Sequence, residues 1–197
     1  MAHTTQVSTP SDTELLIRRS FAAPLRLVFA CLKEPEYVRA WMLGPEGWTM
    51  PVCEIDFRVG GKYRYEWANA DGRRMGMGGV YREIVAPERI VATELFDEDW
   101  TGGETTNTST LTESRGVTTL AIRVRYATKQ ARDGALATGM TEGMEAGFQR
   151  LETLLASMAA AQPPGLSEIS GKPSRFATTP CAVEPQNSRS RTGSKRG

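Results

Sequence analysis

One stretch of this 197-residue chain, residues 128–158, constrains the fold more than any other. The residues of one apolar helix face recur at intervals of three and four positions: Met140, Met144, Gly147, Phe148, Leu151, Leu154, Leu155 and Met158. At 100° per residue these positions fall within an arc of roughly 120°, the width of a helix face that packs on a core. Charged and polar residues occupy the other side, at Glu142, Glu145, Gln149 and Glu152, and are expected to face solvent. The pattern predicts one long amphipathic helix.

Three glycines, Gly139, Gly143 and Gly147, recur every four residues beside the methionines of this helix. Each glycine costs a helix interior about 1 kcal/mol relative to alanine, so three together need a tertiary reason. One interpretation is a close approach of the helix to a sheet. The other is that the missing side chains leave room for a guest molecule.

The segments before this helix alternate apolar and polar residues, as β-strands do. The predicted order is a strand at 14–21, short helices beginning near Pro24 and Pro35, about six strands between residues 52 and 126, and the long helix. Strands gathered between helices are typical of an α+β fold rather than a parallel α/β fold. A curled antiparallel sheet of six to seven strands needs a cover for its inner face, and the long helix is the element suited to provide it.

Composition divides the chain. Residues 13–158 form the predicted domain, and residues 1–12, which are mostly polar, are expected to be disordered. Residues 159–197 are rich in Pro, Ser, Thr and Gly and carry a net charge of +4, so a disordered basic tail is expected. The overall net charge of +1 does not suggest nucleic acid or an acidic membrane surface as a partner.

Cys31, Cys53 and Cys181 form an odd set without paired spacing, which favours a reducing, cytoplasmic setting. The N-terminus lacks the apolar segment of a secretory signal. No apolar run approaches the roughly 20 residues needed to cross a bilayer.

Six motifs in order resemble the START-like (helix-grip, SRPBCC) superfamily, and within it the branch of homologues of the heat-shock-protein-90 ATPase activator. The motifs are Phe21-Ala22-Ala23-Pro24 with Val28-Phe29, Pro35-Glu36 through Trp41, residues 56–63, residues 79–84, residues 87–91 and residues 138–144. The resemblance implies a helix-grip fold with a cavity between the sheet and the C-terminal helix. It is a weak guide to function, because the superfamily hosts lipid carriers, polyketide cyclases, hormone receptors and co-chaperone domains.

The residues predicted to line such a cavity lie on faces that should meet: Tyr65, Trp67, Phe96, Ile122, Val124, Met140, Gly143, Met144 and Phe148. Methionine suits a surface that adapts to guests of varied shape. A packed core made of the same side chains is the alternative, and the sequence leaves both open.

Signals for catalysis are few. His3 is the only histidine and lies in the N-terminal tail, so a histidine base is not expected, nor is a metal site or a cofactor. Asp56 and Arg58 fit a structural pair beside Gly60-Gly61. Tyr65, Tyr81, Glu94 and Arg125 remain as polar groups that could face the cavity.

The predicted function is binding of a small hydrophobic or aromatic ligand, without catalytic residues. Two alternatives stay open: an enzyme of the polyketide cyclase or dehydratase type, and a co-chaperone-type domain that binds another protein. No nucleic acid or membrane partner is expected, and the sequence does not indicate an oligomeric state.

Overall fold

The computed structural model describes residues 4–44, 46–98 and 101–161. The chain divides into two compact units, Met1–Gln162 and Pro163–Gly197, and the described residues all belong to the first. The expected basic tail lies outside the described residues from position 162 on. Residues 159–161, which were assigned to that tail, instead continue the last helix.

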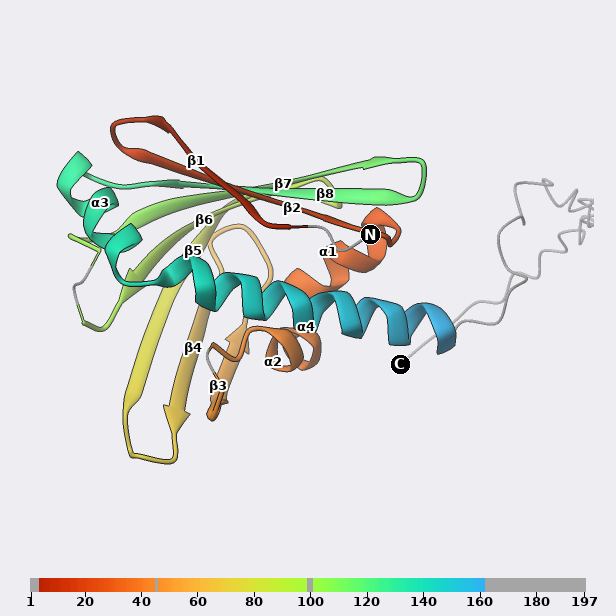
Figure 1. The fold of residues 1–197 in the computed structure, drawn as a ribbon, viewed down its shortest axis with the longest axis horizontal. Helices are drawn as coiled ribbons and strands as arrows, with labels where there is room; N and C mark the ends of the chain where they lie inside the picture. Colours follow the sequence, from red (N-terminus) through yellow and green to blue (C-terminus); the bar gives the residue numbers. More distant parts are fainter. Residues whose placement is uncertain (1–3, 45, 99–100, 162–197) are drawn as a thin grey trace, which may run out of the picture. The chain divides into compact units, whose positions relative to one another are not determined.

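In the described part of the chain, eight strands and four helices follow one another in the order strand, strand, two helices, six strands, two helices (Figure 1). They are β1 (Gln6–Ser11), β2 (Glu14–Phe21), α1 (Leu25–Lys33), α2 (Pro35–Trp41), β3 (Trp48–Ile55), β4 (Lys62–Asn69), β5 (Arg74–Val85), β6 (Arg89–Phe96), β7 (Thr105–Ser114), β8 (Val117–Arg125), α3 (Lys129–Ala137) and α4 (Met140–Ala161).

All eight strands join in one antiparallel sheet with the order β1-β2-β8-β7-β6-β5-β4-β3. The helix α4 packs against the sheet where Phe148 meets Phe21 of β2, crosses in front of β3, β4 and β5, and has α2 beside it (Figure 1). The predicted α+β helix-grip fold is confirmed, with eight strands rather than six to seven.

The additional strand is β1, which pairs with β2 through Val7 opposite Ile17. The expectation of disorder for residues 1–12 is therefore wrong for Gln6–Ser11. Every residue of β1 is exposed, so the strand carries no apolar alternation that a sequence reading could detect. Its structure comes from hydrogen bonding to β2, which is a tertiary interaction.

The predicted single helix over residues 128–158 is divided into α3 and α4. Thr128 caps α3 by accepting a hydrogen bond from the Ala131 N–H at 3.1 Å. Gly139, between the two helices, has a φ of 78°, a backbone conformation that glycine adopts without strain. The first of the three glycines is thus a helix break.

The turn between β3 and β4 depends on the Gly60-Gly61 pair. Gly60 has a φ of 80°, and a Cβ on Gly61 would collide with the backbone oxygen of Asp56. Arg58 Nε donates to Asp56 Oδ1 at 3.0 Å, so the predicted structural pair at this bend is present.

Candidate functional site

The register of the sheet defines one face, because directly paired residues of antiparallel strands project to the same side. One row across five strands joins Tyr81, Ala92, Asn107, Val124 and Leu15. A second row joins Tyr65, Met77 and Phe96 on β4, β5 and β6. We call the side that carries these rows the inner face.

The structure places the predicted site residues on the inner face or on α4. Tyr65, Trp67, Val124 and Phe148 are buried, with exposed fractions of 5%, 4%, 6% and 1%. Phe96, Ile122, Met140 and Met144 pack against the same core but remain partly exposed. The predicted site residues therefore divide into a buried group and a partly exposed group.

Aromatic rings on β4 form one wall of the inner face. The Tyr63 and Tyr65 rings lie 5.0 Å apart between centroids, and Trp67 meets Tyr65 edge-on at 6.0 Å. Trp67 Nε1 donates to the Met42 backbone oxygen at 2.7 Å, which ties this wall to the loop after α2. The Tyr81 ring continues the wall 5.4 Å from Tyr63.

From Gly147 on, α4 packs closely against α2 and β2. Phe148 stacks on the Trp41 ring at 6.1 Å and meets Phe21 edge-on at 6.0 Å. A Cβ on Gly147 would lie 3.4 Å from the Trp41 backbone oxygen, so this glycine allows a close approach of α4 to α2. The glycine stripe thus does allow a close approach at Gly147, but the partner is the helix α2 and not the sheet that was expected.

Gly143, one turn earlier, is different. Apart from its chain neighbours and the adjacent backbone of α4, a Cβ built there would meet no described atom within 4 Å. The neighbouring Met140 has its sulfur 3.8 Å from the Tyr126 hydroxyl, and Met144 is partly exposed. The open surroundings of Gly143 fit the interpretation in which missing side chains leave space.

A polar pair lies on the inner face among these apolar residues. Asn107 Nδ2 donates to Glu94 Oε2 at 2.8 Å. Burial raises the pKa of the Glu94 carboxyl to about 7, although the hydrogen bond from Asn107 acts in the opposite direction. Asn107 Oδ1 is buried and has no hydrogen-bond partner among the described residues.

The tyrosine hydroxyls around this pair remain neutral. Burial raises the pKa of Tyr126 to about 12, and the Glu94 carboxylate adds to the effect. Burial first, and then Glu94, also raise the pKa of Tyr63, whose hydroxyl donates to the Thr93 backbone oxygen at 2.8 Å. These groups can donate or accept hydrogen bonds, but they are not ionised at neutral pH.

Of the four polar groups considered from the sequence, Arg125 does not face the inside. It is exposed, and it lies 3.5 Å from Glu14 at the strand pair β2–β8. Tyr65, Tyr81 and Glu94 do lie on the inner face. Asn107 was not singled out from the sequence, although its place in the alternation Thr105, Asn107, Ser109, Leu111 is a usable signal.

A second polar cluster joins α4 to the sheet and was also missed. Arg19, 3% exposed on the inner face of β2, contacts Glu145 at 2.7 Å and Glu152 at 3.1 Å. The Thr5 N–H donates to Glu145 as well, at 3.3 Å. The prediction that Glu145 and Glu152 face only solvent is therefore wrong, because a buried arginine holds them.

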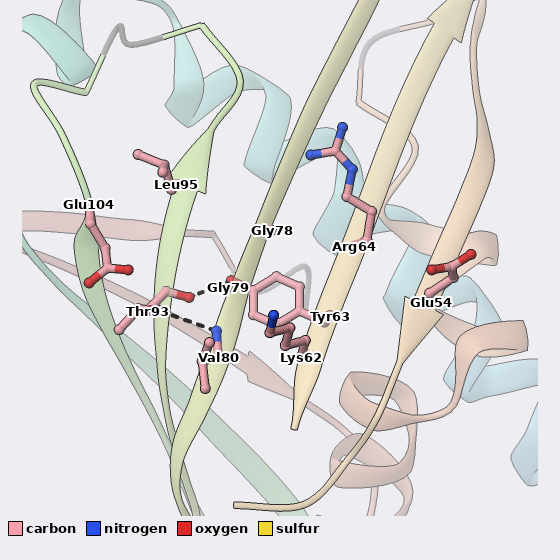
Figure 2. A pocket seen from close by; sticks show the side chains of 10 residues that line it. All are labelled: Glu54, Lys62, Tyr63, Arg64, Gly78, Gly79, Val80, Thr93, Leu95 and Glu104. Atoms are coloured by element: carbon pink, nitrogen blue, oxygen red, sulfur yellow. Dashed lines mark hydrogen bonds between the residues drawn. The ribbon is translucent and has the colours of Figure 1, made fainter. Parts of the chain in front are cut away.

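The opposite, outer side of the sheet carries a hollow of about 450 Å³ over Gly78 (Figure 2). Its floor is bare because Gly78 lies between Arg64 and Leu95 in the register. Figure 2 shows Thr93 bonded to both the Tyr63 hydroxyl and the Val80 N–H. The Arg64 guanidinium is held by Asp97 at 2.6 Å, so its charge is already paired.

Within residues 4–161, apart from the undescribed positions 45, 99 and 100, no group of three or more His, Cys, Asp or Glu side chains is arranged to hold a metal. No helix in the same part of the chain has the length and hydropathy needed to cross a membrane.

A curled antiparallel sheet closed by a C-terminal helix, with two short helices after its second strand, defines the helix-grip class of protein. The family model described as "Activator of Hsp90 ATPase homolog 1-like protein" matches residues 22–156. The chain belongs to this family, within the START-like superfamily that the sequence motifs indicated.

Solved structures of similar proteins agree with this assignment. A protein from Rhodobacter sphaeroides is 37% identical, with a TM-score of 0.74 over 78% of this chain and 98% of that one. A Mycobacterium smegmatis protein is 25% identical, with a TM-score of 0.69 over 78% and 96% of the two chains. The AHSA1 protein from Silicibacter pomeroyi, 22% identical with a TM-score of 0.59 over 76% and 99%, shows the shared fold. Among curated proteins no match was found.

Proposed function

We propose that the protein binds a small hydrophobic or aromatic molecule between the inner face of the sheet and the N-terminal half of α4. The observation that carries the proposal is the partial exposure of Asn107, Ser109 and Ile122. All three lie on the inner face of strands that are paired on both sides, where close packing normally leaves side chains inaccessible. Nearby Val124 and Leu15 are buried, so the accessible space is local.

The surrounding chemistry supports a mostly apolar guest. Tyr65 and Trp67 offer flat aromatic surface, and Met140 and Met144 offer side chains that adjust their shape to a guest. Ligand sites are commonly apolar with a few fixed polar groups, and the Glu94–Asn107 pair supplies such groups.

Titration with a fluorescent apolar probe, N-phenyl-naphthylamine, tests the proposal. The wild type is expected to bind the probe, and Gly143→Leu is expected to weaken binding by about tenfold or more because leucine occupies the open space. Gly134→Leu is the matched control, since Gly134 is an exposed helical glycine on α3 with equally open surroundings. Absence of probe binding by the wild type would refute the proposal. If the wild type and Gly143→Leu bind the probe with equal affinity, the probe does not bind beside Gly143.

One observation favours a second candidate function, an acid–base reaction of the polyketide cyclase or dehydratase type. A carboxyl whose pKa is raised to about 7 can both donate and accept a proton near neutral pH, and Glu94 meets this condition. Cyclisation or dehydration of a synthetic poly-ketone that is lost in Glu94→Gln, while probe binding persists, would support this function.

We also infer a cytoplasmic location. Cys31 and Cys53 are free thiols buried in the core, and unpaired buried cysteines are most common where thiols are kept reduced. Fractionation of cells that express the protein, with detection in the soluble cytoplasmic fraction, tests this inference.

A further inference from the structure

Glu94 is an acidic side chain on the inner face that lacks a cation. Among the described residues its one hydrogen-bonding side chain is Asn107, and no arginine or lysine lies within ion-pair distance. The inner face does carry a cation, Arg19, but Glu145 and Glu152 hold it at 2.7 and 3.1 Å. Arg19 is thus paired with two carboxylates, whereas Glu94 has no arginine or lysine of the described residues beside it.

The groups around Glu94 add acceptors rather than donors. Asn107 uses its amide N–H on Glu94, which leaves its buried Oδ1 without a donor among the described residues. Tyr63 directs its hydroxyl to the Thr93 backbone oxygen, so that proton is not available to the carboxylate. A buried acceptor without a donor destabilises the folded protein, and a guest that brings donors removes part of this cost.

Aromatic and sulfur-containing side chains complete the surroundings. The Tyr63 hydroxyl donates to the backbone oxygen of Thr93, the residue next to Glu94. Burial first, and then the Glu94 charge, raise the pKa of both Tyr63 and Tyr126. The Met140 sulfur lies 3.8 Å from the Tyr126 hydroxyl. Aromatic rings around a carboxylate stabilise a cation, because the ring faces carry negative potential and the carboxylate carries the opposite charge.

We propose that the guest is an apolar or aromatic molecule that carries a protonated amine, and that Glu94 binds the ammonium group while Asn107 holds the carboxylate in position. This inference rests on the proposed function, since it assigns the chemistry of the molecule bound at the same place. The apolar part of the guest then lies along Phe96, Ile122 and Met144, which remain partly exposed.

Competition against bound N-phenyl-naphthylamine at about pH 8 tests the inference, because there the amine is protonated and the carboxylate is ionised. The competitors are naphthylethylamine, naphthylethanol and naphthylacetate, which share a ring system and differ in the charge of the side arm. For the wild type, the amine is expected to displace the probe at a concentration about tenfold or more below that of the alcohol, with the acid weakest.

Glu94→Gln is expected to abolish the preference for the amine while it changes displacement by the alcohol by no more than about twofold. Glu88→Gln, in the exposed turn before β6, is the matched control and should keep the preference. If the amine and the alcohol displace the probe equally well from the wild type, the guest class is wrong although the proposed function stands. If the probe does not bind at all, both fail. The comparison of the amine with the alcohol on the wild type tests the inference even if a variant does not fold.

Discussion

Two parts of α4, residues 140–146 and residues 147–161, carry similar residues and are packed in different ways. In residues 147–161, Phe148, Leu151 and Leu155 have exposed fractions of 1%, 0% and 3%. In residues 140–146, Met140 and Met144 remain partly exposed, and Gly143 has open surroundings. The helical pattern is continuous across both parts, so the difference comes from what lies opposite. Trp41 and Phe21 fill the space against Phe148.

This difference in packing indicates that the two parts of α4 contribute unequally to stability. The tightly packed part, residues 147–161, contributes most of the stability, because close packing of large side chains is what a core provides. The open part, residues 140–146, contributes less. Five predictions sharpen or break this comparison.

The largest expected effect is the loss of Phe148. Phe148→Ala should lower the free energy of unfolding by about 3–5 kcal/mol, since it leaves a cavity between Trp41 and Phe21. Met144→Ala should cost about 1 kcal/mol or less, because Met144 is only partly buried. Chemical denaturation of both variants measures the difference. Equal losses of unfolding free energy in the two variants would mean that α4 is packed equally tightly around Phe148 and around Met144.

The next effect concerns Arg19, which holds α4 at both Glu145 and Glu152. Arg19→Met should cost about 2–4 kcal/mol near pH 7, because Glu145 loses its buried cation. The control Arg18→Met removes the neighbouring exposed arginine on the other face and should change little.

The same contact makes a pH prediction. Hydrogen bonds from Thr5 and then Arg19 lower the pKa of Glu145 to about 2, against a partial opposing effect of burial. A lowered folded-state pKa gives stability that is present above pH 4.5 and is lost as the pH falls through about 2. The gap between wild type and Arg19→Met should therefore narrow between about pH 5 and pH 2. A gap that is independent of pH would show that Arg19 acts by packing alone.

A third effect separates the two remaining glycines of the stripe. Gly147→Leu should destabilise the protein by about 1–3 kcal/mol, since even its Cβ lies 3.4 Å from the Trp41 oxygen. Gly143→Leu should be neutral or stabilising by up to about 1 kcal/mol, because it improves helix propensity without a collision. Thermal melts of the two variants differ in sign if the comparison is right. A clear loss of stability in Gly143→Leu would contradict the claim that the surroundings of Gly143 are open.

The smallest effect is expected at Glu94, the acid on the inner face of β6. Its folded-state pKa of about 7 lies above the ordinary value of 4.5, so its contribution to stability is fully present below pH 4.5 and is lost as the pH rises through 7. Glu94→Gln should match the wild type at about pH 4 and exceed it by about 1–2 kcal/mol at about pH 8. Denaturation at both pH values, with Glu88→Gln as a control that shows no such trend, checks this. A glutamine variant no more stable at pH 8 would mean that Glu94 is well hydrated.

Much of the fold followed from local pattern. The alternation of Tyr63, Tyr65 and Trp67 against Lys62, Arg64 and Glu66 matches β4, and the periodicity from Met140 to Met158 matches α4. Such patterns are readable because a residue's position in a strand or helix fixes the side to which it projects. The helix break at Gly139 was missed, because a glycine inside a periodic pattern also fits an intact helix.

The candidate site was readable only in part. The apolar residues were identified from their alternation, and Glu94 was recognised as a polar group of uncertain direction. The pairing of Glu94 with Asn107 depends on the register between β6 and β7, which the sequence does not encode in any local signal. The contact from Arg19 to Glu145 spans 126 positions, so it was equally hidden.

The sequence by itself determined the family, most of the strands and helices, and the amphipathic face of α4, because each depends on residues close together in the chain. The tertiary structure alone decided three things: that β1 exists, that Arg19 anchors α4, and that Gly143 is open while Gly147 is closed. The physical reason is the same for all three. A strand whose residues are all exposed, a buried ion pair and the space beside a glycine are properties of what lies across from a residue, and a residue's own local pattern does not reveal it.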